Sequence, residues 1–254
     1  MKKLTYITYQ TFPADTANSI QTISNIKYFV KNGINVDLIY PLREKSSSSD
    51  INHLKKHYSF TENFNSIGTK HPYPHGKIKL FPAIWFHLSH FLWSKKIIKT
   101  INKNYVDTDL FITRSDWVFY FLSKKNKKVI FECHQYSKIR RFLLSKSLKK
   151  KNSKIIFLNE NLKNDYKNKK DIKDKSIVLH NGVDFDLFNN EFHRNKNEIV
   201  FIGQLSRFNQ SRNIEFIIES ISKLDNNFKF KIIGASEEEI SRINKISSAK
   251  KIKA

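Results

Sequence analysis

The chain has 254 residues, with 46 Lys and Arg side chains against 23 Asp and Glu, and its formal net charge is +23 at pH 7. This length allows one large domain or two smaller ones. The charge attracts anions such as nucleic acid, acidic lipid or phosphorylated substrates, although lysines spread over the whole chain also fit a general compositional habit. The single cysteine, Cys133, excludes an internal disulfide framework.

Neither a signal peptide nor a membrane-spanning helix is predicted. Met1-Lys2-Lys3 leads into a strand pattern, and the most apolar stretch, residues 81–93, is too short to span a bilayer and contains His87 and His90. We therefore expect a cytoplasmic protein, with attachment to the inner membrane face as an option.

The first ordered segment reads as a βαβ unit. Residues 4–9 alternate like a strand, apolar residues from Ile20 to Val30 recur at helical spacing, and residues 36–40 resume a strand. At the start of the helix lie three small residues, Ala17, Asn18 and Ser19. Backbone N–H groups there favour an anion, and an ordinary capped helix accounts for them equally well. No Gly-x-Gly fingerprint accompanies them, so a dinucleotide site is not predicted.

The next segment is polar and then strongly aromatic. Residues 43–65 are predicted to be irregular. The aromatic stretch from Phe81 to Trp93 runs into a basic helix with Lys95, Lys96 and Lys99. Such a helix suits an anionic lipid interface, and it equally suits a buried position with a solvated end.

Two strands, residues 109–113 and 129–133, are followed by functional side chains. Arg114 ends the first, and Glu132 and His134 lie at the end of the second. Parallel strands would bring these side chains to one edge of a sheet. Arg114 would suit a phosphate, and His134 would suit a phosphate or a sugar hydroxyl, while a strand-end histidine is also a common packing residue.

The remaining chain divides at a sharp turn. A basic helix over residues 138–150 and strands at 155–158 and 176–179 precede His180-Asn181-Gly182-Val183-Asp184, where we expect Gly182 to adopt a positive φ. Residues 184–197 read as a linker. A second βαβ unit follows, and its predicted elements are a strand at 199–203, a loop at 204–212, a helix from Asn213, a strand at 228–233 and a weak helix at 237–246.

These motifs together resemble the GT-B glycosyltransferases, in the group-4 class of retaining enzymes that use nucleotide sugars. The resemblance rests on five segments: Ala17-Asn18-Ser19-Ile20 after Phe12-Pro13; Thr113-Arg114-Ser115; Glu132-Cys133-His134; His180 to Asp184 with Phe188; and Phe201-Ile202-Gly203 with Arg212-Asn213-Ile214.

The resemblance implies an α/β, GT-B-like fold with two Rossmann-like domains, the second of them incomplete. Residues 1–185 would form the acceptor-side domain and residues 186–254 part of the donor domain. The implied roles are catalytic for His134 and Arg114, donor binding for Gly203, Arg207, Arg212 and Asn181, and acceptor or phosphate binding for Ala17, Asn18 and Ser19. No cofactor and no obligatory metal ion are expected.

The chain departs from the family pattern in its second half. Gln204 stands where the family commonly has Arg, and the family's Glu-x7-Glu segment is absent. We expect a hexosyltransferase that moves a sugar from a nucleotide diphosphate to a glycan or lipid-linked acceptor in cell-surface polysaccharide synthesis. The alternatives are a truncated, non-catalytic fragment of such an enzyme and a basic protein that binds nucleic acid or a membrane surface. The sequence contains no recognisable nucleic-acid-binding module, so no nucleic-acid partner is expected.

Overall fold

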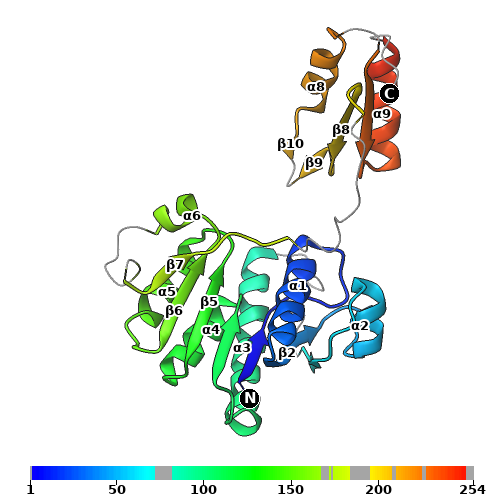
Figure 1. Ribbon diagram of the computed structural model, residues 1–254. Coiled ribbons are helices and arrows are strands. Elements are labelled where there is room, and N and C mark those ends of the chain that lie inside the picture. Colours follow the sequence, from blue (N-terminus) through cyan, green and yellow to red (C-terminus); the bar gives the residue numbers. More distant parts are fainter. Residues whose placement is uncertain are drawn as a thin grey trace. The chain divides into compact units, whose positions relative to one another are not determined.

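The computed structural model in Figure 1 describes residues 2–71, 82–166, 172, 174–183, 195–207, 210–224 and 227–249. The chain divides into two compact units, unit 1 (Met1–Asp184) and unit 2 (Phe185–Ala254). We describe each unit by itself. The predicted linker, from Asp184 past Phe188, falls largely on residues 184–194, which lie outside the described part of the chain.

Unit 1 is built on a seven-stranded sheet with the order β3-β2-β1-β4-β5-β6-β7, in which every neighbouring pair is parallel. The strands are β1 (Lys3–Ile7), β2 (Asn35–Leu42), β3 (Asn65–Lys70), β4 (Leu110–Thr113), β5 (Val129–Cys133), β6 (Ser153–Phe157) and β7 (Ser176–Val178). The first three strands extend the sheet in one direction and the last four in the other. The switch point therefore lies between β1 and β4.

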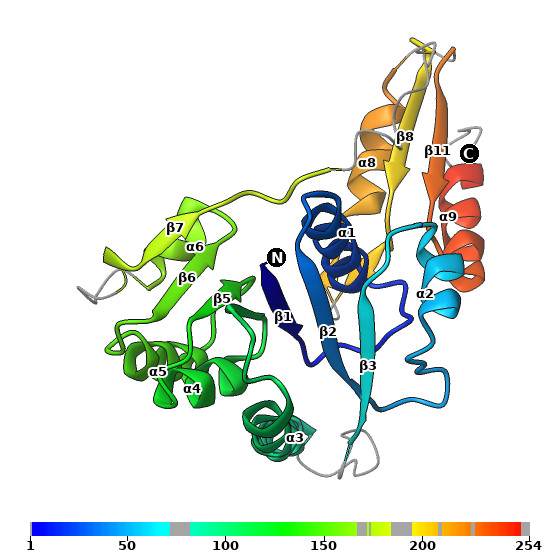
Figure 2. The same cartoon turned by 60° about the horizontal axis from the view of Figure 1, so that its bottom comes forward.

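Helices cover both faces of this sheet, as Figure 2 shows. They are α1 (Ala17–Lys31), α2 (Ile51–Tyr58), α3 (Pro82–Asn104), α4 (Asp116–Lys124), α5 (Lys138–Ser147) and α6 (Glu160–Asn164). Residues of α1 and α2 share one core with Tyr6 of β1, and residues of α3, α4 and α5 share the other core with Ile7. Successive side chains of a strand point to opposite faces, so β1 supplies both cores.

Most helices of unit 1 begin at a side chain that accepts a backbone hydrogen bond. Thr16, Asp50, Ser115, Ser137 and Asn159 each accept from an amide two or three residues ahead, at the starts of α1, α2, α4, α5 and α6. Such caps satisfy N–H groups that a helix leaves free at its first turn.

Two sequence-based expectations were wrong in unit 1. The polar segment 43–65 contains α2, whose one buried residue is Leu54, so it shows almost no apolar periodicity. Gly182 does not adopt a positive φ, and residues 179–183 form neither a turn nor a bend.

The aromatic stretch before Lys95 is buried at its C-terminal end and exposed at its N-terminal end. Trp93 is fully buried in α3, whereas Ile84 and Leu88 are exposed, and Phe81 lies outside the described residues. None of the helices in the described ranges is both long and apolar enough to cross a bilayer.

Unit 2 has a parallel pair of strands, β8 (Glu198–Ile202) and β11 (Lys229–Ile233), with the helices α8 (Ile214–Ile221) and α9 (Glu237–Ala249). The predicted loop 204–212 instead contains a short hairpin of β9 (Ser206–Arg207) and β10 (Gln210–Ser211). The hydrophobic core of unit 2 consists of Leu205, Ile214, Ile218, Ile221, Phe230 and Ile243. Both units are therefore α/β structures, as the sequence predicted.

Candidate functional site

The switch point of the sheet in unit 1 carries a cluster of polar side chains. In open α/β sheets ligands bind beyond the carboxyl ends of the strands at such a point. Arg114 directly follows β4, and Glu132 and His134 lie at the carboxyl end of the neighbouring β5. A cavity of about 510 Å³, lined in part by Lys3 and Asp37, lies instead at the amino ends of β1 and β2, where this rule does not place a ligand.

Glu132 is the centre of this cluster. Its Oε2 accepts a hydrogen bond from the Tyr6 hydroxyl at 2.6 Å, and its Oε1 accepts from Arg114 Nη2 at 2.8 Å and from His134 Nε2 at 2.9 Å. The side chains of Arg114, Glu132 and His134 are 6%, 8% and 17% exposed, respectively. Two predicted site residues are thus held on one buried carboxylate.

The surroundings keep this carboxylate ionised. Burial raises the pKa of Glu132, but the hydrogen bond from His134 together with the charge and hydrogen bond of Arg114 outweigh it and lower the pKa to about 2. Burial also raises the pKa of Tyr6, so its hydroxyl remains a donor. Because an ionised carboxylate only accepts, His134 must carry its hydrogen on Nε2. In this tautomer Nδ1 is the acceptor nitrogen of the ring.

Arg114 ties the cluster to the start of α1 and to the segment after β7. Its Nη1 donates to the Asn18 carbonyl at 2.9 Å, and its Nη2 donates to Gln21 Oε1 at 2.8 Å. Gln21 Nε2 in turn donates to Asn181 Oδ1. A chain of polar contacts therefore brings Asn18, Arg114, His134 and Asn181 together within unit 1.

The three small residues at the start of α1 have different surroundings. Ser19 is buried, and its amide and hydroxyl bond to the capping residue Thr16, as in an ordinary capped helix. Ala17 and Asn18 are exposed. Of the three residues, Ser19 is therefore the one that is shielded from solvent.

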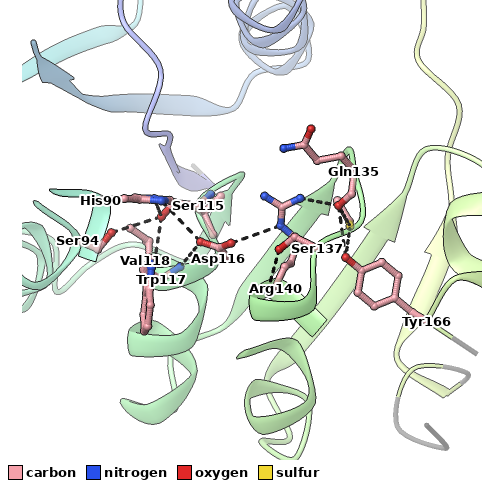
Figure 3. A network of polar contacts seen from close by, with 12 residues as sticks. His90, Ser94, Ser115, Asp116, Trp117, Val118, Gln135, Ser137, Arg140 and Tyr166 are labelled. Atoms are coloured by element: carbon pink, nitrogen blue, oxygen red, sulfur yellow. Dashed lines mark hydrogen bonds and ion pairs between the residues drawn. The ribbon is translucent and has the colours of Figure 1, made fainter. Parts of the chain in front are cut away.

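A second polar network follows the same carboxyl edge of the sheet, and Figure 3 shows it from close by. His90 of α3 contacts the Ser115 hydroxyl at 2.6 Å and lies 3.7 Å from Asp116 Oδ1. Asp116 Oδ2 is 3.4 Å from Arg140 Nε, and Arg140 Nη1 donates to the Gln135 carbonyl. Burial lowers the pKa of His90 to about 4, against the opposing charge of Asp116.

Sequence reasoning did not assign a role to Tyr6, Gln21 or any residue of the second network. Gln21 directly follows the motif segment Ala17-Asn18-Ser19-Ile20 and lies one helical turn after Asn18, and this position was a signal in the sequence. The pairing Ser115-Asp116 directly after β4 was a similar signal, because residues that cap a helix at a strand end face the same edge. Tyr6 lies inside an apolar strand and gave no signal.

In unit 2 the predicted donor residues Gly203 and Arg212 lie against each other. Gly203 has a φ of +138°, and a Cβ atom there would be 2.9 Å from Arg212 Nη1. Gly234 at the end of β11 has a φ of +98° and packs on the Gly203 backbone. Arg207 belongs to β9, but its side chain lies outside the described part.

A cavity of about 1010 Å³ adjoins these strand ends in unit 2. Hydroxyl groups of Ser206, Ser211, Ser236 and Ser241 contribute to its lining. Ser236 and Glu239 exchange backbone and side-chain hydrogen bonds at the start of α9, which fixes this side of the cavity.

Metal ligands do not cluster in the described part of the chain. No group of three or more His, Cys, Asp and Glu side chains is arranged there to hold a metal ion.

Comparison with known proteins identifies the fold. No protein-family model matches the chain, and no curated protein matches it by sequence. A glycosyltransferase from Rickettsia africae matches with a TM-score of 0.62 and 17% identity, over 99% of this chain and 66% of that one. Anabaena HepE in complex with UDP and glucose matches with a TM-score of 0.59 and 11% identity, over 100% of this chain and 67% of that one. The lipopolysaccharide outer core galactosyltransferase WaaB matches with a TM-score of 0.60 and 12% identity, over 98% of this chain and 65% of that one.

These identities support the fold alone, and they confirm the GT-B-like architecture that the sequence predicted. The chain spans about two thirds of the length of the structures that it matches.

Proposed function

We propose that the chain is a retaining, nucleotide-sugar-dependent glycosyltransferase of the group-4 class. It would transfer a hexose to a glycan or lipid-linked acceptor in cell-surface polysaccharide synthesis, at the cytoplasmic face of the membrane. The observation that carries this proposal is the cluster of Arg114, Glu132 and His134 at the switch point of the sheet in unit 1. The chain shares its fold with glycosyltransferases.

On the acceptor side, the polar cluster favours sugar hydroxyls over phosphate. Arg114 is paired with Glu132, so their charges largely cancel. His134 presents Nδ1 as an acceptor, because Glu132 occupies Nε2. A sugar hydroxyl would donate to this nitrogen, while the exposed turn at Ala17 and Asn18 would lie beside the sugar.

On the donor side, Arg212 would meet the diphosphate. Its guanidinium lies over Gly203 beside the start of α8, where the helix dipole adds positive potential. Departure of the diphosphate develops negative charge, which a fixed cation stabilises in the transition state. HepE, a similar fold, was crystallised with UDP and glucose, which supports a uridine diphosphate sugar as the donor. We propose that no metal ion is required.

The test is sugar transfer from a panel of nucleotide sugars, measured for the wild type and for Arg212→Ala. We expect the variant to lower kcat about 100-fold, in the range found when one electrostatic stabiliser is removed. Lys223→Ala is the matched control, because Lys223 is an exposed cation at the opposite end of α8. An unchanged rate in Arg212→Ala would refute the diphosphate assignment, and loss of transfer in EDTA would refute metal independence.

A further inference from the structure

The outer face of α5 combines exposed apolar and basic side chains. Ile139 and Phe142 are 40% and 59% exposed, while Leu143 and Leu144 on the inner side are buried in the core. Lys138 and Lys146 are also exposed, and Lys146 Nζ lies 5.6 Å from the centre of the Phe142 ring. We call Lys138, Ile139, Phe142 and Lys146 the α5 face.

Positive charge on this face is not compensated by neighbouring carboxylates. No Asp or Glu occurs between Glu132, which is buried, and Glu160. Lys149 and Lys150 continue the exposed basic surface beyond the helix. Within the described ranges no ion pair involves Lys138, Lys146, Lys149 or Lys150, whereas Lys31 on the opposite face of the sheet pairs with Glu62.

We infer that the α5 face docks on an anionic lipid bilayer. Apolar side chains of an interfacial helix enter the boundary of the acyl chains while its lysines meet lipid phosphates. Nucleic acid would match the charge but not Ile139, because an aliphatic side chain offers no ring for a base to stack on. The inference names a membrane partner for the proposed function, but it does not depend on sugar transfer.

The inference changes the position of the membrane contact that the sequence suggested. Trp93, the last aromatic residue of the stretch from Phe81, is fully buried and cannot contact lipid. Ile84 and Leu88 at the other end of α3 are exposed, and α3 lies in the same helical layer as α5 (Figure 2). The exposed lysines at 149–151, at the end of the basic helix that the sequence predicted, adjoin the surface that we infer.

The test is co-sedimentation of the full chain with vesicles, without any nucleotide sugar. Vesicles of phosphatidylcholine alone are compared with vesicles that contain phosphatidylglycerol. We expect binding only to the anionic vesicles. The double variant Lys138→Glu/Lys146→Glu should lower the partition coefficient at least tenfold, since each Lys near such a surface contributes about a factor of five. Phe142→Ser should weaken binding several-fold.

Two matched controls separate this face from the general charge. Lys56→Glu changes an exposed lysine of α2 on the opposite side of the sheet, and Phe216→Ser changes a phenylalanine of α8 that is 69% exposed. Both variants should bind like the wild type. Equal losses in the control and α5 variants, absence of binding to anionic vesicles, or stronger retention on DNA would overturn the inference. Failure of the sugar-transfer assay would not affect these results.

Discussion

At the scale of single residues, the protein places one carboxylate where three donors converge. Glu132 accepts from Tyr6, Arg114 and His134, so a buried negative charge is stabilised by a guanidinium group and two further donors. Removing Glu132 would take this shared acceptor from Tyr6, Arg114 and His134 in a poorly solvated place. Glu132 is therefore a positioning residue for Arg114 and His134.

The ionisation of Glu132 predicts a specific dependence of stability on pH. Its pKa falls from an ordinary 4.5 to about 2 on folding. As the pH is lowered, the unfolded chain therefore binds the proton at a higher pH than the folded protein does. The resulting stabilisation is present above pH 4.5 and is lost as the pH falls towards 2. It amounts to about 3 kcal/mol. We expect Glu132→Gln to be less stable at pH 6 and to lose less stability than the wild type between pH 4.5 and 2.5.

Urea unfolding at several pH values measures this difference. Glu62→Gln is the control, because the ion pair of Glu62 is with the partly exposed Lys31, at 3.8 Å. Parallel pH curves for the wild type and Glu132→Gln would contradict the assignment.

The sequence placed Arg114 and His134 at the ends of two strands, and the structure brings these strand ends together. Arg114 and His134 were identified because each follows an apolar run, and the sheet brings both to Glu132. Tyr6 and Gln21 were missed for a physical reason. Their role depends on which strands become neighbours, and the order β1-β4-β5 is not encoded in any local pattern.

At the scale of elements, a helix or strand could be predicted only where its own residues show a local apolar pattern. Helices and strands with apolar periodicity, such as α1, β5 and β8, were predicted within a few residues. The helix α2 was missed because it buries one side chain, and the edge strand β3 because its residues are mostly polar and only partly buried. Both gain their structure from neighbours and not from their own composition.

The second network joins three helices through a buried neutral histidine. His90 contacts Ser115 at the start of α4 and Asp116, which in turn lies beside Arg140 of α5. Its pKa is about 4 in the folded protein and 6.5 in the unfolded chain, so unfolding takes up a proton between these values. Stability should fall by about 3 kcal/mol as the pH falls from 6.5 to 4.

The variant His90→Gln keeps a donor near Ser115 and cannot titrate. We expect it to be less stable at pH 7 and to show a flatter stability curve between pH 6.5 and 4 in urea unfolding. His53→Gln, on the exposed side of α2, should retain the curve of the wild type. An unchanged slope in His90→Gln would show that another group titrates in this window.

Two glycines of the motifs, Gly203 and Gly182, differ in whether the backbone and the space around them tolerate a side chain. Gly203 has a φ of +138°, and an added Cβ would meet Arg212, whereas Gly182 has neither a positive φ nor an atom within 4 Å of such a Cβ. We expect Gly203→Ala to destabilise unit 2 by about 1–3 kcal/mol. Gly182→Ala should change stability by less than about 0.5 kcal/mol. Thermal unfolding followed by circular dichroism compares the two, and equal shifts in Tm would contradict the structure.

At the scale of the whole molecule, the two units have cores of very different size. Unit 1 has two large clusters of buried side chains, while the core of unit 2 consists of Leu205, Ile214, Ile218, Ile221, Phe230 and Ile243. Burial of apolar area is the main source of stability, so unit 2 should unfold at a lower urea concentration.

The tryptophans allow this expectation to be measured. All three, Trp85, Trp93 and Trp117, belong to unit 1, whereas circular dichroism reports helices of both units. We expect circular dichroism to begin to change at a lower urea concentration than tryptophan fluorescence. Ile218→Ala should shift only the early change, and Leu122→Ala, in the core of unit 1, should shift the fluorescence. Coincident curves for both probes would mean that the chain unfolds as one cooperative body.

The bond between Gln21 and Asn181 also holds the chain to unit 1 beyond its last strand. The Leu179 amide donates to the Phe157 carbonyl, and Asn181 is held to α1, so the chain stays fastened for three residues beyond β7. Each extended residue spans about 3.5 Å. Because the Leu179 bond would persist, breaking the bond between Gln21 and Asn181 would release two residues, about 7 Å of extended chain, so a glutamine of α1 sets how far the segment after β7 stays bound to unit 1.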